Sequence, residues 1–547
     1  MLENFLLHLV LHIQNVHMTT RKSEYKPLLF TTTMRNPTRM KGLLNILSIY
    51  NKQILTNDLC IEIMGAIVKH GLYRPMKNNK NIIEKWGSSR ISESSQIGIE
   101  LLSNLEVEYL IRNNPQDHKE AGFAKGWPSR FATVFDFPKE LGFVYYNLNE
   151  PIEFSTLGLN LANSVSIKIQ DDIIIYSENN PKIEQQVFLH ALSKYQRNNP
   201  FVRVLNENVP LILLLEVISK LNLDEKYNGA GISILELPLI IFWKDNNSES
   251  LYQTIKKIRE KYGYNPSWEV IIDICVKEIM DGEFKKFEPK SIMNEYPDEF
   301  IRKMRLTGLI SLRGGGRFLD INKNEIEKIE YVLKKYSVYP KFTTEREYFN
   351  YMSEVDDFLI TESPTPIPPE VNNKLLEKWT GVYKWEIIKL ELEILANKKV
   401  SKDNVLKYLT NSTRLEFLTS LAIKSKIPNI KVNPNYPCDD EGIPTSTAGG
   451  GKGDIECIEE ENGILIEVTM SEGRTQTMME VWPITRHLEK FQQDYKNAMC
   501  YFVAPSIFID SSRQIKYTKT EENLNIEAYT IMNFINYLEN NTKLFHI

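Results

Sequence analysis

Acidic residues near the C-terminal end of the chain have the types and the spacing that metal-assisted hydrolysis needs. Asp454 stands at the head of a short apolar run, and Glu467 lies 13 positions further on inside a second run. Two carboxylates held together can bind a divalent metal ion beside a phosphate and activate a water molecule. The pair therefore favours phosphodiester hydrolysis, although the same spacing also occurs in solvated turns.

Two predicted strands position this pair. Residues 454–458 and 464–469 are predicted as strands, and residues 459–463 as the polar turn between them. Alternation along the second strand places Ile464, Ile466 and Val468 on one face and Leu465, Glu467 and Thr469 on the other. An acid inside an apolar strand is costly to bury unless a cation or hydrogen bonds satisfy it. The pattern matches the PD-(D/E)xK nuclease core, except that Thr469 stands where that core has lysine.

A predicted helix follows the second strand. Glu480 and His487 are seven residues apart, so they share one face of the helix provided that Pro483 does not break it. A lone histidine on a helix is more often structural than catalytic, and both roles stay open for His487. The glycine-rich run at 449–453 invites a nucleotide-binding interpretation, but it departs from the GxxxxGK[ST] pattern at Ser446 and at Gly453.

The N-terminal part contains a weak internal repeat. Residues 141–162 and 307–329 each read as strand, polar turn, strand and helix. A glycine leads each unit, Gly142 in the first and Gly308 in the second. A helix followed by such a hairpin is typical of a winged helix, in which the hairpin lies beside a DNA-facing helix.

Basic stretches accompany these hairpins. Residues 21–41 carry six basic residues and one acid, and residues 301–319 carry five basic residues and no acid. The predicted DNA contacts are Arg35, Arg39, Trp127, Arg130, Arg305, Arg313 and Arg317. Arg313 and Arg317 flank three glycines, which allow the turn to approach a phosphate backbone closely. Residues 125–130 form a third candidate patch. Each patch taken alone is more often a solvated charged surface, but three on one chain together weaken that interpretation.

Whole-chain composition restricts the class of protein. Hydrophobic residues make up 42% of the 547 positions and charged residues 25%, which excludes a disordered, collagen-like or coiled-coil chain. The net charge of −5 argues weakly against a nucleic-acid partner, but it sums basic stretches and an acidic one, residues 434–462, with eight acids and one lysine. No stretch approaches 18 uncharged apolar residues, so we expect no membrane partner. Five widely spaced cysteines favour a reducing, cytoplasmic location.

Several motifs together resemble the AlwI-type type IIS restriction endonucleases and their relatives, the strand-specific nicking endonucleases. They lie at Gly453–Glu456, Glu467–Thr469, Met479-Glu480, Pro483–His487, Leu415–Leu418, Arg305–Leu309 and Leu141–Val144. The resemblance covers most of the chain.

The resemblance implies a magnesium-dependent nuclease site. The acidic active-site residues would be Asp454, Glu467 and Glu480, with Glu416 from the preceding helix and His487 nearby. One or two Mg²⁺ ions would be bound by Asp454, Glu467, the Val468 carbonyl and Glu480, and Arg486 would clamp the DNA backbone. The family has threonine where Thr469 stands. This chain differs from some relatives at Trp482, where they have a second acid.

The implied fold is a multidomain α+β chain. A mostly helical DNA-recognition region with winged-helix-like subdomains precedes a C-terminal α/β nuclease domain of the PD-(D/E)xK type. The expected divisions are an N-terminal extension at 1–17, with Met18 as an alternative start, subdomains at 18–165 and 166–335, a linker at 336–375 and the nuclease domain at 376–547. Pro364, Pro366, Pro368 and Pro369 favour the linker.

Double-stranded DNA is the expected partner. We expect it to be cut at a short fixed distance from an asymmetric site such as GGATC or GAGTC, as in relatives. One active site cuts one strand, so second-strand cleavage needs a transient homodimer or a small-subunit partner. The alternatives are a nicking enzyme, the large subunit of a heterodimer, or a DNA-binding protein without catalysis. No [ND]PP[YFW] motif is present, so modification would need a separate cognate methyltransferase.

Overall fold

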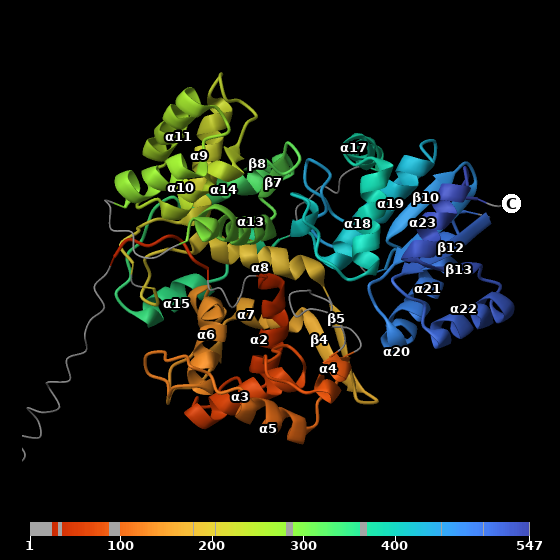
Figure 1. The fold of residues 1–547 in the computed structure, drawn as a ribbon, viewed down its shortest axis with the longest axis horizontal. Helices are drawn as coiled ribbons and strands as arrows, with labels where there is room; N and C mark the ends of the chain where they lie inside the picture. The colour runs from red at the N-terminus through yellow and green to blue at the C-terminus, as the bar shows by residue number, and fades with distance from the viewer. Residues whose placement is uncertain are drawn as a thin grey trace, which may run out of the picture.

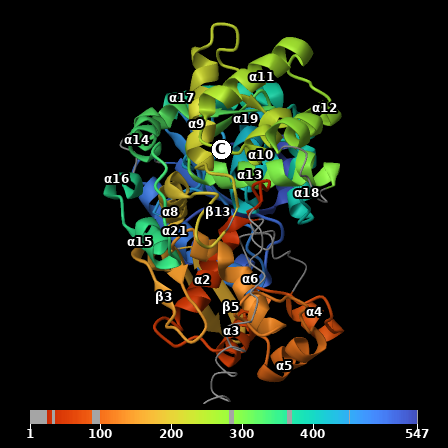
Figure 2. The same ribbon diagram turned by 90° about the vertical axis from the view of Figure 1, so that its left-hand side faces the viewer.

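The computed structural model describes residues 24–30, 36–86, 99–178, 180–202, 204–280, 288–361, 369–449, 451–495 and 497–545. Residues 1–17 and the predicted DNA contact Arg35 lie outside these ranges. A mostly helical N-terminal part and a C-terminal α/β domain lie side by side (Figure 1). The N-terminal part has two lobes, residues 36–178 and 204–336, and helix α8 (Pro181–Lys194) lies between them in both views (Figures 1 and 2).

The first lobe packs helices around a small antiparallel sheet. Its helices are α2 (Met40–Ser48), α3 (Asn57–Lys69), α4 (Lys80–Trp86), α5 (Asn104–Asn113), α6 (Trp127–Glu140) and α7 (Thr156–Asn163). Its strands are β1 (Ile99–Glu100), β2 (Val144–Tyr145), β3 (Glu153–Phe154), β4 (Val165–Gln170) and β5 (Ile173–Glu178). Strands β1, β5 and β4 form one sheet in that order, and β2 pairs only with β3.

The sequence-predicted unit at 141–162 is present as β2, β3 and α7, but its strands have only two residues each. The longer hairpin of this lobe is β4–β5, which directly follows α7 and which the sequence analysis missed. Its turn at Asp171 and Asp172 has positive φ at both residues, as a two-residue hairpin turn requires. The turn has Asp-Asp where Asn-Gly is usual, so the sequence does not indicate it.

The second lobe repeats this arrangement. Its helices are α9 (Pro210–Leu223), α10 (Leu237–Phe242), α11 (Ser248–Tyr262), α12 (Trp268–Asp273), α13 (Tyr296–Leu306) and α14 (Ile326–Tyr336). Two short helices follow this lobe, α15 (Glu345–Ser353) and α16 (Asp357–Ile360). Strands β6 (Ile232–Ser233), β7 (Ile310–Arg313) and β8 (Phe318–Ile321) pair in the order β6-β8-β7. In both three-stranded sheets, the strand that comes first in the chain pairs with the second strand of the hairpin. Helices α15 and α16 lie within the segment predicted as a linker, and α16 packs on α8.

The C-terminal domain is a three-layer α/β sandwich. Strands β9 (Lys431–Pro434), β10 (Ile455–Glu459), β11 (Asn462–Val468), β12 (Asn497–Ala504) and β13 (Ile526–Thr530) form one sheet in chain order. One face is covered by α17 (Pro369–Val382), α19 (Asn411–Lys426) and α23 (Ile531–Asn540), with α18 (Trp385–Ala396) packed on α19 and α23. The other face is covered by α21 (Trp482–Phe491) and α22 (Ile509–Glu521), with α20 (Gly473–Gln476) before them.

The predicted hairpin that carries Asp454 and Glu467 is present as β10 and β11, with Ile455 opposite Ile466. The predicted alternation also holds. Ile464 and Ile466 belong to the core on one side of the sheet, and Leu465 belongs to the core on the other side. Glu467 therefore shares a face with Leu465, on the side covered by α21.

The second lobe docks onto the C-terminal domain through buried ion pairs. The acidic loop, residues 439–441, lies against the β7–β8 hairpin. Arg313 Nη2 lies 2.7 Å from Asp440 Oδ2, and Arg313 also pairs with Asp320 and Glu441. Ser311 Oγ donates to Asp440 Oδ1 at 2.6 Å, and Arg305 Nη1 lies 3.5 Å from Asp439 Oδ2.

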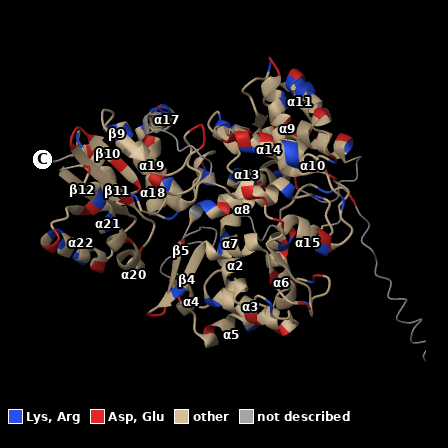
Figure 3. Cartoon of the chain, turned by 180° about the vertical axis from the view of Figure 1, so that it is seen from behind, with Lys and Arg blue, Asp and Glu red and all other residues tan. Residues whose placement is uncertain are grey.

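This docking corrects one of the predicted DNA contacts, because Arg313 is held by the acidic loop rather than presented to DNA. Arg305 pairs with the same loop but also lines the cavity beside Asp454 and Glu467, so its predicted contact stays a prediction. The last of the turn glycines is also covered, since a Cβ on Gly316 would lie 2.6 Å from the Asn404 carbonyl oxygen, whereas Gly314 and Gly315 are exposed. The sequence shows the local charge of a hairpin but not which distant acids the fold brings to it. In Figure 3, Lys and Arg are mixed with Asp and Glu over both parts of the chain.

We expect Arg313→Ala to destabilise the protein, because it leaves the buried Asp320 and the half-buried Asp440 without their cation. Removing one member of a buried ion pair costs about 3 kcal/mol or more. Urea unfolding followed by tryptophan fluorescence measures the loss. Arg317→Ala is the matched control, since Arg317 lies exposed on the same hairpin and a surface change costs within about 0.5 kcal/mol. Equal unfolding midpoints for the two variants would contradict the docking role of Arg313.

Candidate active site

The sheet brings Asp454 and Glu467 together at neighbouring strand ends. Asp454 immediately precedes β10, and Glu467 is the penultimate residue of β11, where only 6% of it is exposed. The backbone N–H of Val468 donates to Asp454 Oδ2 at 2.8 Å. The Asp454 backbone oxygen in turn accepts from Asn435 N at 2.9 Å. Backbone pairing therefore fixes both the position and the orientation of the first carboxylate.

Glu480 reaches the site from a widened helical turn. A π-helical segment, Thr477–Val481, runs directly into α21, whose second residue is Pro483. Proline has no N–H to donate to the preceding turn, so the wider turn accommodates it without breaking the helix. The expectation that Pro483 leaves Glu480 and His487 on one helical segment is met, and both line the same cavity.

Two hydroxyl groups orient Glu480. Thr469 Oγ1 donates to Glu480 Oε1 at 2.9 Å, and Ser471 Oγ donates to the same oxygen at 2.6 Å. Thr469, in the position of the usual lysine, therefore acts as a hydrogen-bond donor to an acid. The sequence analysis missed Ser471, which is fully buried. Its alternation with Thr469 directly after β11 was the available signal.

His487 lies against the second carboxylate. His487 Nδ1 is 2.9 Å from Glu467 Oε1. Burial lowers the pKa of His487, and the neighbouring charges of Arg486 and Lys490 lower it further. A neutral imidazole that donates its Nδ1 proton to Glu467 satisfies both observations, and it leaves Nε2 as an acceptor.

Glu416 completes the group from the opposite layer. It lies on α19, is 3% exposed, and accepts a hydrogen bond from the Ala448 backbone N–H at 2.9 Å. Thr410 caps the start of α19 by accepting from Thr413 N, and most of the helix is buried. The core of the domain thus holds Glu416 in place.

Negative charge is concentrated at this site. Burial and the neighbouring charge of Glu467 raise the pKa of Asp454 well above its usual value. The pKa of Glu467 is raised by burial and by Glu480, and that of Glu416 by burial and by Asp454. Burial also raises the pKa of Glu480, although the Ser471 and Thr469 hydroxyls oppose this. A bound cation would favour the ionised form of all four carboxyl groups.

The residues present fit a divalent metal by the chemistry of their donors. Carboxylate and backbone oxygens are the ligands that Mg²⁺ prefers. Within the described ranges, however, no three His, Cys, Asp or Glu side chains already stand as a metal-ligand group. Each carboxylate is instead turned to its own protein donor, as the bonds from Val468, His487, Thr469 and Ala448 show.

A cavity of about 410 Å³ joins this site to the N-terminal part. The four carboxylates and His487 line one side of it. Its lining also includes residues of the N-terminal part: Thr38, Lys41, Tyr176, Glu178 and Glu184 from the first lobe and α8, and Arg302 and Arg305 from α13 of the second lobe. The acidic site therefore shares one cavity with both lobes of the N-terminal part.

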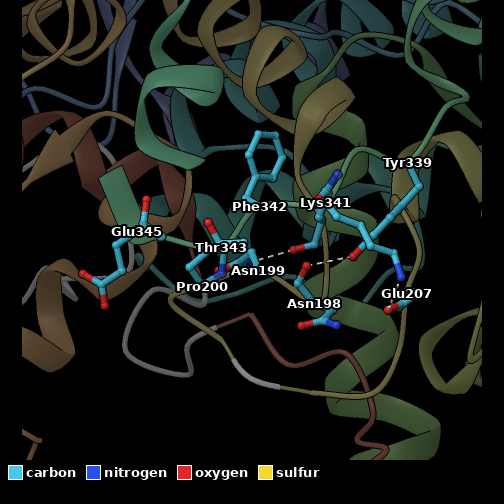
Figure 4. Close-up of a pocket in the computed structure, with 11 residues that line it drawn as sticks. Asn198, Asn199, Pro200, Glu207, Tyr339, Lys341, Phe342, Thr343 and Glu345 are labelled. Atoms are coloured by element: carbon cyan, nitrogen blue, oxygen red, sulfur yellow. Dashed lines mark hydrogen bonds and ion pairs between the residues drawn. The ribbon is translucent and has the colours of Figure 1, made fainter. Parts of the chain in front are cut away.

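A second cavity, of about 430 Å³, lies in the N-terminal part between the ends of α8 and α15 (Figure 4). Lys341 and Glu207 at its wall lie 3.4 Å apart, and Tyr339 donates to the Asn198 carbonyl. The buried Gln196 and Asn199 donate to backbone carbonyls of this wall. These groups satisfy one another, so this cavity is a weaker candidate for chemistry.

The remaining predicted DNA contacts are dispersed. The predicted DNA contact by Trp127 is wrong. Its side chain is 6% exposed and its indole N–H donates to the Ile111 carbonyl, so it cannot stack on bases. Arg39 is partly buried and donates to the Leu72 carbonyl, and burial lowers its pKa to about 10. Arg130 donates to the Tyr73 hydroxyl. Arg317 and Arg486 are exposed.

Sequence comparison identifies the family. The pattern described as "AlwI restriction endonuclease" matches residues 139–402 and 370–536, which is well over half of the chain. The chain belongs to the AlwI restriction endonuclease family. It is therefore a site-specific DNA nuclease, as the motif resemblance predicted. No curated protein sequence matches it. None of the described helices is long and apolar enough to cross a bilayer.

Solved structures of restriction endonucleases also align with the chain. The small subunit R.BspD6I2 of the heterodimeric endonuclease R.BspD6I is 25% identical, with a TM-score of 0.23 over 28% of this chain and 80% of that one. FokI, free and bound to DNA, is 12% identical in each case, with a TM-score of 0.23 over 96% of this chain and 97% of that one.

We expect Gly453→Ala to disable the site. The new Cβ would overlap the packed Leu465 side chain and lie 2.9 Å from Glu467 Oε1, so the carboxylate must move. Overpacking of this kind costs about 1–3 kcal/mol, and cleavage should fall further than stability does. Plasmid cleavage and thermal unfolding measure the two effects. Gly449→Ala, four residues earlier with nothing within 4 Å of its Cβ, should retain both, and equal activities would count against this geometry.

Proposed function

We propose that the chain is a magnesium-dependent type IIS restriction endonuclease that cuts DNA at a short fixed distance from an asymmetric recognition site. One observation carries this proposal. Glu467 and Glu416 are buried, and Asp454 and Glu480 half-buried, at a cavity whose lining also includes residues of the N-terminal part. A nuclease that reads with one part and cuts with another needs its acidic site to face bound DNA in this way.

Asp454, Glu467 and the Val468 carbonyl would hold the metal ion, and Glu480 a second ion or the attacking water. When bound, Mg²⁺ neutralises the charge of the phosphorane-like transition state and lowers the pKa of a bound water. Thr469 and Ser471 keep Glu480 in one orientation by donating to the same oxygen. His487, held through Nδ1 by Glu467, has Nε2 free to accept a proton or to contact a phosphate.

The local topologies support the finer fold assignments. A hairpin of two antiparallel strands with the acids at its end, followed by a parallel strand and a helix, favours a PD-(D/E)xK-like nuclease core. The sheet orders β1-β5-β4 and β6-β8-β7, each with a helix directly before the hairpin, favour two winged-helix-like lobes.

The second strand of DNA requires a second active site. One cavity with one set of carboxylates hydrolyses one strand, so double-strand cleavage would need a transient homodimer or a small-subunit partner. A strand-specific nicking enzyme, or the large subunit of a heterodimer, is the alternative. Protection of host DNA would need a separate methyltransferase. The site preference we favour is GGATC or GAGTC, and run-off sequencing of digested plasmid reads site, offset and strand together.

We expect Glu467→Gln and Asp454→Asn each to reduce cleavage about 10³-fold or more while leaving DNA binding intact, because only the charge at the reacting phosphate is removed. EDTA should abolish wild-type cleavage. Cleavage assays and gel-shift titrations separate the two properties. The control is Glu459→Gln, an exposed acid at the end of the same strand β10, which should retain activity. Activity of the wild type in EDTA, or of either site variant at the normal rate, would contradict the assignment.

We expect the yield of linear plasmid to rise more steeply than that of nicked plasmid as enzyme concentration increases, because the second cut needs a second chain. A cleavage time course at several enzyme concentrations, resolved on agarose, follows both products. Nicked circles that persist at every concentration would exclude the homodimer and favour the nicking enzyme or a missing small subunit.

A further inference from the structure

The glycine-rich run at 449–453 departs from the nucleotide-binding pattern but lies at the acidic site. Lys452 of this run lines the same cavity as Asp454 and Glu467, and it is exposed. In the sequence it stands two residues before Asp454. The run therefore brings a positively charged side chain to the cavity in which the four carboxyl groups meet.

The backbone that follows Lys452 is fixed against the site. Asn435 Nδ2 donates to the Gly453 carbonyl at 2.6 Å, and the Asn435 backbone N–H donates to the Asp454 carbonyl at 2.9 Å. Gly453 lies so close to Glu467 that a Cβ would be 2.9 Å from Glu467 Oε1. Lys452 is thus held directly beside the residue that borders the Glu467 carboxylate.

The other Lys and Arg side chains that line this cavity are neutralised by acids. These pairs are Lys41 with Glu184, Arg302 with Asp298 and Arg305 with Asp439. Among the residues that the structure describes, no hydrogen-bond or ion-pair partner holds the Lys452 side chain. Of these four lining cations, Lys452 is therefore the one whose charge is not already committed to an acid of the described chain.

Hydrolysis of a phosphodiester benefits from a cation of this kind. Negative charge grows on the nonbridging oxygens of the phosphate in the transition state, and a positioned positive charge stabilises it. Thr469 stands where PD-(D/E)xK sites have a lysine, and its hydroxyl donates to Glu480 instead. His487 does not supply the charge either, because burial lowers its pKa. Lys452 lines the cavity from the same domain and can supply it.

We propose that Lys452 is a catalytic residue whose ammonium group contacts a nonbridging oxygen of the scissile phosphate. It stabilises charge in the transition state and transfers no proton. Lysine is a compact cation on a flexible stem, which suits a single phosphate oxygen. Gly451, with positive φ and nothing within 4 Å of a Cβ built on it, leaves room for the DNA backbone beside the lysine. This inference rests on the proposed function, because it assumes that the chain hydrolyses DNA at the acidic site.

Single-turnover cleavage with enzyme in excess and saturating Mg²⁺ tests this role separately from DNA binding. We expect Lys452→Met to lower the cleavage rate about 100-fold or more, because one positioned donor to the developing charge contributes that much. Its affinity for uncut DNA in EDTA, measured by gel shift, should stay within about 10-fold of wild type, as for one phosphate contact among many. Lys452→Arg keeps the charge and should cut at least about 10 times faster than Lys452→Met.

Lys519→Met is the matched control, because Lys519 is an exposed lysine on α22 of the same domain and does not line the cavity. It should cut at the wild-type rate. Thermal unfolding of each variant should match wild type, since both side chains are exposed and their replacement leaves no buried cavity.

The outcomes separate the inference from the proposed function. If the wild-type protein cuts no DNA in the presence of Mg²⁺, the proposed function fails. If it cuts, but Lys452→Met cuts bound DNA at the wild-type rate, the catalytic role of Lys452 is wrong, even where binding has weakened. Equal rates for Lys452→Arg and Lys452→Met would also overturn it, because the charge would then not matter.

Discussion

The gathering of four carboxyl groups, two buried and two half-buried, at one cavity is the constraint on which the rest of the structure depends. An ionised carboxylate taken out of water costs several kcal/mol unless hydrogen bonds or a cation compensate it. Asp454, Glu467, Glu480 and Glu416 each have such a bond, from Val468, His487, Thr469 or Ala448. These donors come from the end of β11, from α21 and from the loop after β9, so elements of different layers must pack together to hold the acids in place.

The π-helical turn and the glycine at 453 have the same explanation. A regular helix through Pro483 would lose a backbone bond, and the widened turn lets Glu480 enter the site while α21 continues beyond it. Gly453 leaves the space that Glu467 and Leu465 fill. Both features are local departures from regular structure beside acidic side chains, as expected where function rather than stability sets the geometry.

The chemistry of the site could be predicted from sequence because it lies on two strands and one helix that are close in the chain. The period-2 alternation of residues 464–469 placed Glu467 on the correct face, and the seven-residue spacing of Glu480 and His487 placed both on one helical segment. The β4–β5 hairpin was missed because its turn is Asp171-Asp172, and Ser471 because the predicted strand ended at residue 469, although Ser471 continues the alternation of that strand. The pairing of Arg305 and Arg313 could not be predicted, because their partners lie in an acidic loop more than 120 residues away in the chain.

That pairing also changes what the net charge of the chain means. The basic stretch at 301–319 and the acidic stretch at 434–462 looked in the sequence like a DNA-facing surface and a metal site. In the structure part of each stretch neutralises the other, because Arg305 and Arg313 meet residues 439–441. Positive charge buried in this way cannot release counterions from DNA, so it adds little to non-specific affinity. Of the predicted contacts, Arg317 on the β7–β8 hairpin and Arg486 on α21 stay exposed, so both can still meet a DNA phosphate.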